Sequence, residues 1–386
     1  MKNKRTPDIR FPGFPGDWEQ RKLGEILKVN SGRDYKHLQQ GNIPVYGTGG
    51  YMLSVDDKLS DEDAIGIGRK GTINNPQLLK APFWTVDTLF YMTTKEKNDL
   101  LFCYSLAKKI HWKKYDESTG VPSLSKSSID KISIGIPTPA EQSKIGNFFK
   151  QLDDTIALYQ QELTTLKQTK KGFLQKMFPK EGESVPEIRF PGFPKEWEQC
   201  NILEVSKVFI GLVTTMTENY RESGTLLIRN SDIKENRFEF SNNPIHLDES
   251  FAEQNHTRRL IIGDVVTVHT GDVGTSAVIT ERENGSIGFA TINSRPNPNL
   301  LDSNYLATFF NTERHKKYAI KMSTGDGRSN YNLKDFNKLT VPLPSIEEQK
   351  QIGLFFKYFN KTIALHQKEL ELLQETKKAF LQKVFV

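Results

Sequence analysis

The chain has 386 residues, a formal net charge of +6, 36% hydrophobic residues and 26% charged residues. This length allows two or three domains with separate cores, and two isolated cysteines, Cys103 and Cys200, suggest neither a disulfide framework nor a zinc site. No run approaches the roughly 18 apolar residues of a membrane helix, and residues 1–11 lack the apolar stretch of a leader. We therefore expect a cytoplasmic protein with no membrane segment, whose modest net charge does not by itself indicate nucleic-acid binding.

The chain opens on a segment that occurs twice. Residues 7–15, PDIRFPGFP, recur at 186–194 with a single substitution, and a Trp-Glu-Gln sequence follows each copy. Behind these openings, residues 17–135 and 200–340 differ almost completely, the first being net basic and the second net acidic. Similar ends around unlike middles predict one scaffold that carries two different reading surfaces.

The first middle segment has the pattern of a mixed α/β domain. Short apolar runs bounded by turn residues predict strands at 43–47, 64–67 and 83–86. Residues 100–110 have helical spacing. Residues 66–71 match GxGxxG, but residues 72–76 cannot continue as the required helix, so we expect no dinucleotide site. A glycine-rich hairpin with a basic tip either contacts DNA phosphates or a guanine edge, or is simply a solvated turn.

Residues 136–178 predict one long helix, and residues 341–385 are a near copy of it. In both, apolar residues alternate at steps of three and four over about five heptads, which is the spacing of a coiled-coil seam. Thr138 with Glu141 predicts a capping box at the first helix start, as Ser345 with Glu348 does at the second. The apolar seam residues are Ile145, Phe149, Leu152, Ile156, Leu163, Leu166, Phe173, Ile352, Phe356, Phe359, Ile363, Leu370, Leu373 and Phe380.

Four other side chains fall on matched seam positions, namely Tyr159, Lys170, His366 and Lys377. A polar seam residue can fix the register of two helices, and apolar faces beside the seam could dock a partner's helices or a second copy. Each helix would span about 58 Å. If the two share a seam, the second runs antiparallel to the first, and the two domains lie at opposite ends of a rod with pseudo-twofold symmetry.

The second middle segment repeats the mixture of elements. The sequence predicts strands at 225–229, 264–269 and 276–280, and a helix at 303–310. Residues 270–274 take the place of the earlier glycine-rich hairpin, with the acidic Asp272 in place of its basic pair, so the two loops should read different chemistry. A Ser-Thr-Gly sequence closes each segment, at 118–120 and 323–325.

Candidate DNA contacts are arginine, asparagine, lysine and hydroxyl side chains near these loops. Arginine and asparagine read base edges through paired hydrogen bonds, whereas lysine, serine and threonine mostly contact phosphates. Any one of them could instead be an ordinary surface residue, and His269 a core histidine. The candidates are Arg33, Arg69, Lys70, Thr72, Lys113, Lys114, Arg229, Asn230, His269, Thr270, Arg328, Asn330 and Tyr331.

Motifs of catalysis are missing from the sequence. It contains no GxxxxGK[ST], no Asn-Pro-Pro-Tyr/Phe motif of amino-methyltransferases, no HExxH and no GxSxG. We therefore expect that the chain catalyses nothing by itself and holds neither a metal nor a cofactor.

Two unlike segments, each followed by a helix reading PxPxxEQxxIGxFF…IAL…ExLxxLxxTKKxFLQKxF, resemble the specificity subunit of type I restriction-modification enzymes over essentially the whole chain. The opening RFPGFPxxWE is similar to that family as well. The resemblance implies an α+β fold, with two mixed α/β target recognition domains separated by two long antiparallel coiled-coil helices. We expect the recognition domains at 1–135 and 180–340, and the conserved helices at 136–179 and 341–386.

The resemblance also implies a function. Each recognition domain would bind one half of a bipartite target in double-stranded DNA, and the helices would set the spacer and dock two methyltransferase subunits. Those subunits would bring S-adenosylmethionine and methylate a flipped adenine in each half, and motor-nuclease subunits using ATP and Mg²⁺ would join them. Two alternatives stay open: an enzyme that modifies or cuts DNA unaided, and a coiled-coil scaffold for other proteins.

Overall fold

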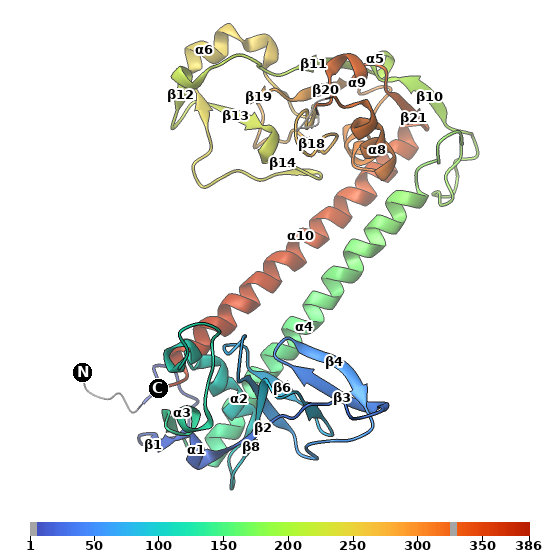
Figure 1. Ribbon diagram of the computed structural model, residues 1–386. Helices are drawn as coiled ribbons and strands as arrows, with labels where there is room; N and C mark the ends of the chain where they lie inside the picture. The colour runs from blue at the N-terminus through green and yellow to red at the C-terminus, as the bar shows by residue number, and fades with distance from the viewer. Residues whose placement is uncertain (1–5, 325–329) are drawn as a thin grey trace. The chain divides into compact units, whose positions relative to one another are not determined.

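The computed structural model describes residues 6–324 and 330–386. Contacts divide the chain into unit 1, which comprises Met1–Gln161 and Lys368–Val386, and unit 2, which comprises Glu162–Gln367. Each unit therefore holds one of the unlike segments, the start of the helix that follows it and the end of the other long helix (Figure 1).

Unit 1 is built on an antiparallel sheet of order β2-β8-β5-β6. Its strands are β2 (Leu27–Ser31), β8 (Leu89–Thr94), β5 (Ala64–Gly68) and β6 (Gln77–Leu79). Helix α2 (Leu100–Lys109) packs on β5 and β8, and β5 is buried along its whole length. A second sheet of order β4-β3-β7 consists of β4 (Gly50–Val55), β3 (Gln40–Gly47) and β7 (Trp84–Thr85). The remaining elements are β1 (Glu19–Lys22), α1 (Leu23–Ile26), η1 (Trp112–Tyr115), α3 (Lys126–Asp130) and β9 (Ser133–Ile136), which pairs with β1.

Unit 2 repeats this plan with a sheet of order β11-β20-β17-β18. Its strands are β11 (Ser206–Ile210), β20 (Ile292–Pro296), β17 (Val265–Thr267) and β18 (Ser276–Val278). A second sheet of order β12-β16-β13-β19 consists of β12 (Tyr220–Arg221), β16 (His246–Leu247), β13 (Thr225–Arg229) and β19 (Ile287–Phe289). The other strands are β10 (Glu198–Asn201), β14 (Ile233–Lys234), β15 (Arg237–Phe238) and β21 (Thr340–Leu343). The helices are α5 (Ile202–Val205), α6 (Glu249–Gln254), α7 (Ser303–Phe310), α8 (Glu313–Met322) and α9 (Leu333–Phe336), with 3-10 turns η2 (Thr217–Asn219), η3 (Asn230–Asp232) and η4 (His256–Arg258).

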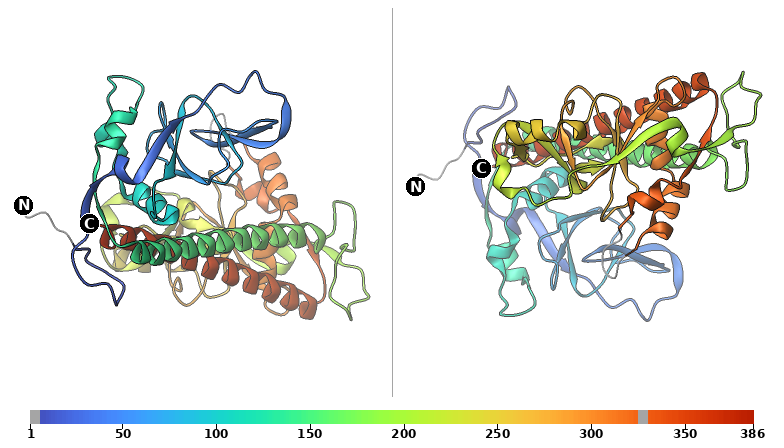
Figure 2. Two further views of the ribbon diagram at one scale, coloured as in Figure 1. Left: turned by 90° about the horizontal axis from the view of Figure 1, so that it is seen from below. Right: turned by 90° about the horizontal axis from the view of Figure 1, so that it is seen from above.

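The two predicted long helices are present as α4 (Pro139–Lys176) and α10 (Ile346–Lys383). In unit 1, Phe148 packs edge-on against Phe380, with 5.2 Å between ring centroids; in unit 2, Phe173 packs in the same way against Phe355 at 5.2 Å. Within each unit, residues later in α4 contact residues earlier in α10, so the two helices lie side by side and antiparallel (Figures 1 and 2). Every apolar seam residue predicted above is buried or half-buried, which confirms the heptad pattern.

The core of each unit is completed by the end of the helix that belongs to the other repeat. Phe385, just after α10, lies 5.5 Å from Phe102 and 5.8 Å from Phe149 between ring centroids in unit 1. In unit 2, Phe178, just after α4, lies 5.5 Å from Tyr305. Both inserted phenylalanines are almost fully buried. The matching positions of the duplicated helix ends therefore fill matching cores.

Candidate nucleic-acid interface

The duplicated opening segments anchor each variable segment to a long helix. Arg10 donates from Nε and Nη2 to the two carboxylate oxygens of Glu141 at 2.7 and 2.8 Å, and Arg189 binds Glu348 in the same way at 2.7 Å for both bonds. Both glutamates are fully buried, and these bonds raise the pKa of each arginine. The predicted capping boxes are therefore only half right. Thr138 accepts a hydrogen bond from the Glu141 amide at 3.4 Å, but the carboxylate turns to the arginine.

The residues that follow these glutamates fix one helix of each variable segment to the long helix. Gln142 accepts a hydrogen bond from the amide of Asp99, the N-cap of α2, at 3.0 Å, and Gln349 accepts one from Asp302, the N-cap of α7, at 2.9 Å. At Gly146, a Cβ atom would lie 2.6 Å from the Phe102 amide. The EQxxIG part of the duplicated motif thus holds α2 and α7 in direct contact with the long helices.

Loops from four parts of the chain meet at one end of the main sheet in unit 1. We name this surface loop edge 1; it consists of residues 32–34, 68–72, 85–88 and 118–124. The amide of Arg33 donates to the Thr85 carbonyl at 2.9 Å, and the amide of Arg69 donates to the Thr88 carbonyl at 2.8 Å. The amide of Leu124 in turn donates to the Arg69 carbonyl at 2.9 Å. Loop edge 1 is therefore a continuous hydrogen-bonded rim.

Four of the predicted DNA-contacting residues lie on loop edge 1, and all four are exposed: Arg33, Arg69, Lys70 and Thr72. The Arg69 guanidinium lies 5.7 Å from the centroid of the Phe90 ring, a cation–π contact that helps to position it. No ion pair engages Arg33, Arg69 or Lys70 within residues 6–324 and 330–386, so their charges are not neutralised by that part of the protein. Four cationic or hydroxyl side chains on one rim suit contact with DNA.

Lys113 and Lys114 lie in η1, shortly before the 118–124 loop, and are exposed. The neighbouring Trp112 is not available for stacking, because it is 1% exposed and its indole N–H donates to the Ala107 carbonyl at 2.8 Å. Asp116 then accepts hydrogen bonds from the amides of Ser118 and Ser123, at 3.0 and 2.9 Å, which closes the loop. The two lysines thus project from a rigid support.

Unit 2 carries an equivalent rim, loop edge 2, which consists of residues 211–213, 229–230, 268–274, 288–291, 324 and 330–331. Its polar side chains form a chain of hydrogen bonds. Asn230 Oδ1 accepts from the His269 amide at 2.8 Å, His269 Nδ1 lies 2.8 Å from Thr270 Oγ1, and Thr270 donates to Asn330 Oδ1 at 2.9 Å. Burial lowers the pKa of His269, so the ring favours its neutral form. The structure thus brings four of the candidate residues, Asn230, His269, Thr270 and Asn330, together in one cluster.

Two predicted residues of unit 2 are placed otherwise, and a third is not described. The Tyr331 side chain is fully buried in the core and offers no surface to DNA, so its assignment as a contact is wrong. Arg229 is a weaker candidate than expected, because its guanidinium is bound by Asp232 at 2.9 Å. Arg328 lies outside the described residues.

The strand register shows how the two rims correspond. Isolated bridges join Lys70 to Ser123 and Thr270 to Asn330, so Thr270 occupies the position of Lys70, and His269 that of Arg69. Asp272, which the sequence analysis aligned with the basic pair, instead accepts a hydrogen bond from Thr275 at 2.6 Å within its own turn. The prediction of different chemistry therefore rests on other residues. The cationic Arg69 and Lys70 of unit 1 correspond in register to the neutral His269 and Thr270 of unit 2.

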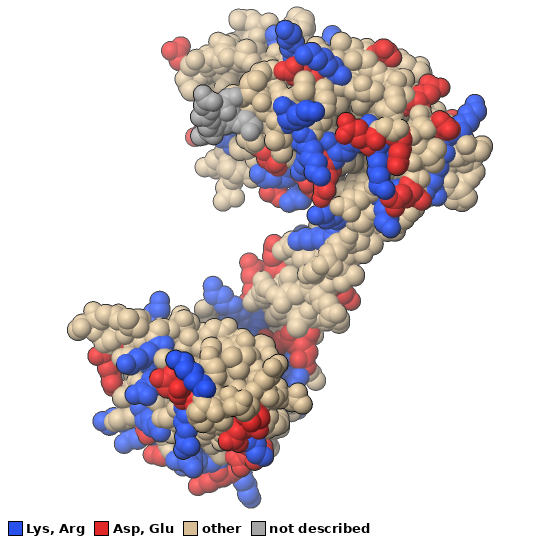
Figure 3. Space-filling model, turned by 45° about the vertical axis from the view of Figure 1, so that its right-hand side comes forward, with Lys and Arg blue, Asp and Glu red and all other residues tan. Residues whose placement is uncertain are grey.

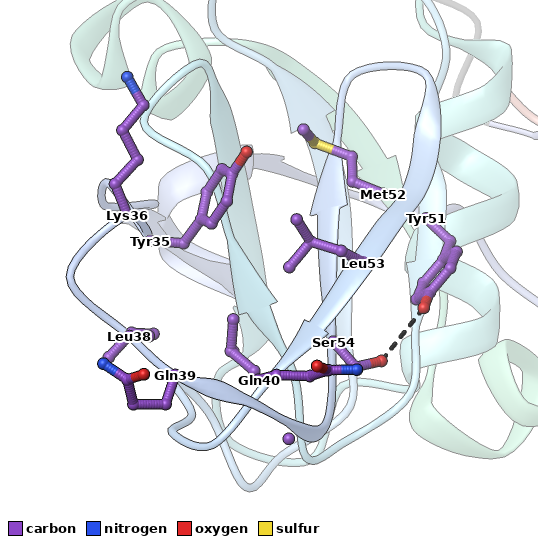
Figure 4. A pocket seen from close by; sticks show the side chains of 11 residues that line it. Tyr35, Lys36, Leu38, Gln39, Gln40, Tyr51, Met52, Leu53 and Ser54 are labelled. Carbon is purple, nitrogen blue, oxygen red and sulfur yellow. Dashed lines mark hydrogen bonds between the residues drawn. The ribbon is translucent and has the colours of Figure 1, made fainter.

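A shallow groove of about 660 Å³ adjoins loop edge 1, between the 35–41 loop and strand β4. Tyr35, Met52 and Leu53 point into it, and Tyr51 and Ser54 at its side lie within hydrogen-bond distance of each other at 3.2 Å (Figure 4). Tyr35, the first residue that lines the groove, follows Arg33 by two positions in the chain, so the groove begins next to loop edge 1.

The long helices combine a polar break in the seam with exposed apolar side chains. Lys170 is 12% exposed and lies 3.7 Å from Glu235, and the matched Lys377 is 16% exposed and paired with Asp153; burial lowers the pKa of both lysines. Leu158 and Leu365, which also match, are 53% and 51% exposed. Lys377 therefore pairs across the seam with α4, whereas Lys170 pairs with the turn between β14 and β15, and the repeated leucines lie outside the seam.

One feature with a recognisable sequence signal escaped the sequence analysis. Helix α8 was not predicted, although its Lys316, Lys317 and Tyr318 repeat the Lys-Lys-Tyr sequence of η1, a signal that direct comparison of the two segments would have revealed.

On the face shown in Figure 3, basic side chains are interspersed with acidic ones in both units, so no continuous basic surface marks a binding site there.

Other kinds of site find little support. In the described part of the chain, no three His, Cys, Asp or Glu side chains are grouped to hold a metal ion, and no helix is long and apolar enough to cross a membrane. Cys103 is a buried free thiol whose pKa burial raises to about 12, whereas Cys200 is free and half-buried.

Comparison with known proteins connects this geometry to a family. The family described as type I restriction modification DNA specificity domain matches residues 15–168 and 194–375. The chain is 22% identical to the type I restriction enzyme MjaVIII specificity subunit of Methanocaldococcus jannaschii, an alignment that covers 95% of this chain and 92% of that relative. It is 20% identical to the EcoDI specificity subunit of Escherichia coli, over 88% and 80% of the two chains.

Two solved structures share the fold. The S subunit of a type I restriction-modification system from M. genitalium superposes with a TM-score of 0.68 at 14% identity, over 99% of both chains. A chain from a structure that concerns complex assembly and conformational transition of the type I R-M system gives a TM-score of 0.54 at 16% identity, over 96% of this chain and 98% of that one.

Proposed function

Because the chain belongs to the family of type I restriction-modification DNA specificity domains, we propose that it selects a bipartite DNA target, with loop edge 1 reading one half and loop edge 2 the other. The single observation that carries this assignment of surfaces is the match between the two rims. Both lie at the same end of equivalent sheets, in units whose opening segments bind a long helix through equivalent Arg-Glu pairs, yet they present different side chains. A scaffold held constant under two different surfaces suits an asymmetric target.

The cationic side chains on loop edge 1 and in the neighbouring η1 support direct contact with DNA. Arg33 and Arg69 have the paired donors that match guanine O6 and N7, and Lys70, Lys113 and Lys114 suit phosphates. In loop edge 2, the amide and imidazole groups of Asn330 and His269 provide both donors and acceptors, so this half would read base edges with less help from charge.

We assign no catalytic step to this chain. Methyl transfer would come from two methyltransferase subunits that bring S-adenosylmethionine, and cleavage from motor-nuclease subunits that use ATP and Mg²⁺. The exposed leucines at matched positions of the long helices, Leu158 and Leu365, support docking of a partner at two equivalent places.

The test is co-expression with the partner methyltransferase in a host free of DNA methylation, followed by mapping of modified adenines through single-molecule sequencing. We expect two short specified blocks around a fixed gap, methylated on opposite strands. The methyltransferase expressed without this chain is the control. Absence of new methylation, with the partner bound and active, would favour a scaffold; methylation or cutting by the purified chain alone would favour an enzyme.

A further inference from the structure

A row of alternating charges crosses the centre of loop edge 1. Strands β2, β8 and β5 are neighbours in the sheet, and at this end Arg33 follows β2, Asp87 precedes β8 and Arg69 follows β5. Since paired strands lie about 4.8 Å apart, the three positions form a basic, acidic, basic sequence across adjacent strand ends. The acidic member was not among the residues that the sequence singled out.

The backbone holds Asp87 firmly in this row. It lies in a tight turn closed by the hydrogen bond from the Leu89 amide to the Val86 carbonyl, at 3.0 Å. On one side the Gly32 amide donates to Leu89 at 3.1 Å, and a Cβ atom on Gly32 would lie 2.0 Å from the Val86 carbonyl. On the other side the Arg69 amide donates to Thr88. The turn is therefore clamped between the two arginine-bearing loops.

The fold makes no visible use of the Asp87 carboxylate. The side chain is exposed, and no hydrogen bond or ion pair engages it within residues 6–324 and 330–386. Asp116 on the same rim is different, since its carboxylate closes the 118–123 loop. Asp87 is thus a rigidly placed carboxylate that is available to a ligand.

A free carboxylate on a surface that faces DNA is repelled by the phosphates, so it is favourable only where a hydrogen-bond donor meets it. In the major groove, guanine presents two acceptors, thymine an acceptor and a methyl group, and adenine a donor beside an acceptor, whereas cytosine presents its N4 amino donor alone. Of the four bases, cytosine therefore matches a lone carboxylate best.

We propose that Asp87 is a specificity-determining residue that accepts a hydrogen bond from the N4 amino group of a cytosine in the half-site read by unit 1. A flanking arginine, Arg33 or Arg69, donates to guanine O6 and N7 beside it. This inference rests on the proposed function and names one base pair of its target.

In unit 2, the three equivalent positions, all among the described residues, do not carry this row of charges. Sheet register places Leu212 at the position of Arg33, Phe289 at that of Asp87 and His269 at that of Arg69. The charged row is therefore confined to one unit, and its effect should be confined to one half-site.

The experiment compares the wild-type chain with Asp87→Asn, each co-expressed with the partner methyltransferase and mapped by single-molecule sequencing. We expect the wild type to require a C·G pair in one half. In Asp87→Asn, methylation of sites with another base at that pair should rise roughly ten-fold relative to the original sites, while the other half and the gap stay unchanged. Glu96→Gln is the matched control, because Glu96 is exposed beyond the opposite end of β8.

A second measurement uses the wild-type complex and does not depend on the folding of a variant. A duplex in which that cytosine is replaced by pyrimidin-2-one, which lacks the 4-amino group, should bind roughly ten-fold more weakly to the wild type. Asp87→Asn keeps one acceptor oxygen but loses the charge, so the same replacement should weaken the binding of this variant by clearly less than it weakens the binding of the wild type. Equal binding of both duplexes by the wild type, an unchanged motif in Asp87→Asn, or a wild-type target without a C·G pair in either half would overturn the proposal. A wild type that yields no bipartite target would instead overturn the proposed function.

Discussion

Arg10 binds the buried carboxylate of Glu141 through two hydrogen bonds, and 179 residues later in the opening repeat Arg189 binds Glu348 in the same geometry. Arg10→Leu would leave Glu141 buried without its partner, which should lower the free energy of unfolding of unit 1 by about 3 kcal/mol. Urea denaturation of the purified chain measures this. Arg21→Leu is the control, since Arg21 and Glu25 form an exposed pair and its loss should change stability little. Equal losses in the two variants would show that Glu141 does not need Arg10.

Two glycines in α4 should respond in opposite ways to the same substitution. At Gly146 an added methyl would lie 2.6 Å from both the Asp99 carboxylate and the Phe102 amide, whereas at Gly172 it would meet nothing within 4 Å. Gly146→Ala should therefore destabilise the protein by about 2 kcal/mol, and Gly172→Ala should stabilise it by about 0.5–1 kcal/mol through lower chain entropy. Thermal unfolding followed by circular dichroism compares them. A stabilised Gly146→Ala would mean that α2 can move away from α4.

His315 should make unit 2 sensitive to acid. Burial lowers the pKa of His315 to about 4, against about 6.5 in an unfolded chain. Between these values the unfolded state takes up a proton that the folded state does not, so stability falls as the pH drops from about 6.5 to about 4. The loss amounts to about 3 kcal/mol over that range, and the residue has no such effect above pH 7. Urea denaturation at a series of pH values should show this slope, and His315→Phe, which keeps the ring stacked on Phe310, should reduce it. An unchanged slope in the variant would place the sensitive group elsewhere.

Removal of Arg69 on loop edge 1 and removal of Lys113 and Lys114, which lie beside it in η1, should affect DNA binding in different ways. Arg69→Ala should relax one base pair of one half-site, because an arginine that reads guanine carries sequence information. Lys113→Ala with Lys114→Ala should instead weaken binding to all sites and lower the salt dependence of log K by about 0.9 for each lost phosphate contact. Binding of the assembled complex to matched and mismatched duplexes at several salt concentrations separates the two effects. A relaxed specificity in the double lysine variant would contradict this division.

The fold was predictable where sequence period and repetition are strong. The long helices, their seam and the strands β5, β13 and β17 follow from apolar spacing alone. Duplication of the helix sequence showed that the two long helices are equivalent. The partners of the repeated motif were not predictable. Glu141 has the spacing of a capping residue, and only tertiary structure shows that it turns to Arg10.

The candidate interface was predicted in part, for a related reason. Arg33, Arg69 and Lys70 carry charges that suggest DNA, whereas Tyr331 was named as a contact beside Asn330 and is buried. Its burial depends on packing with Phe336 and His315, which no local pattern reveals. Asp87 was overlooked because an acidic residue near DNA is unexpected until the basic residues on both sides are seen.

The burial of Phe385 and Phe178 in matching cores has a consequence for evolution. Both phenylalanines, both Arg-Glu anchors and the matched glycines Gly146 and Gly353 lie in duplicated sequence, so a genetic crossover inside that sequence leaves all of these residues in place. A recombinant gene would then join a new variable segment to the same anchoring residues. New DNA specificities in such proteins can therefore arise in a single step, by exchange of a whole segment.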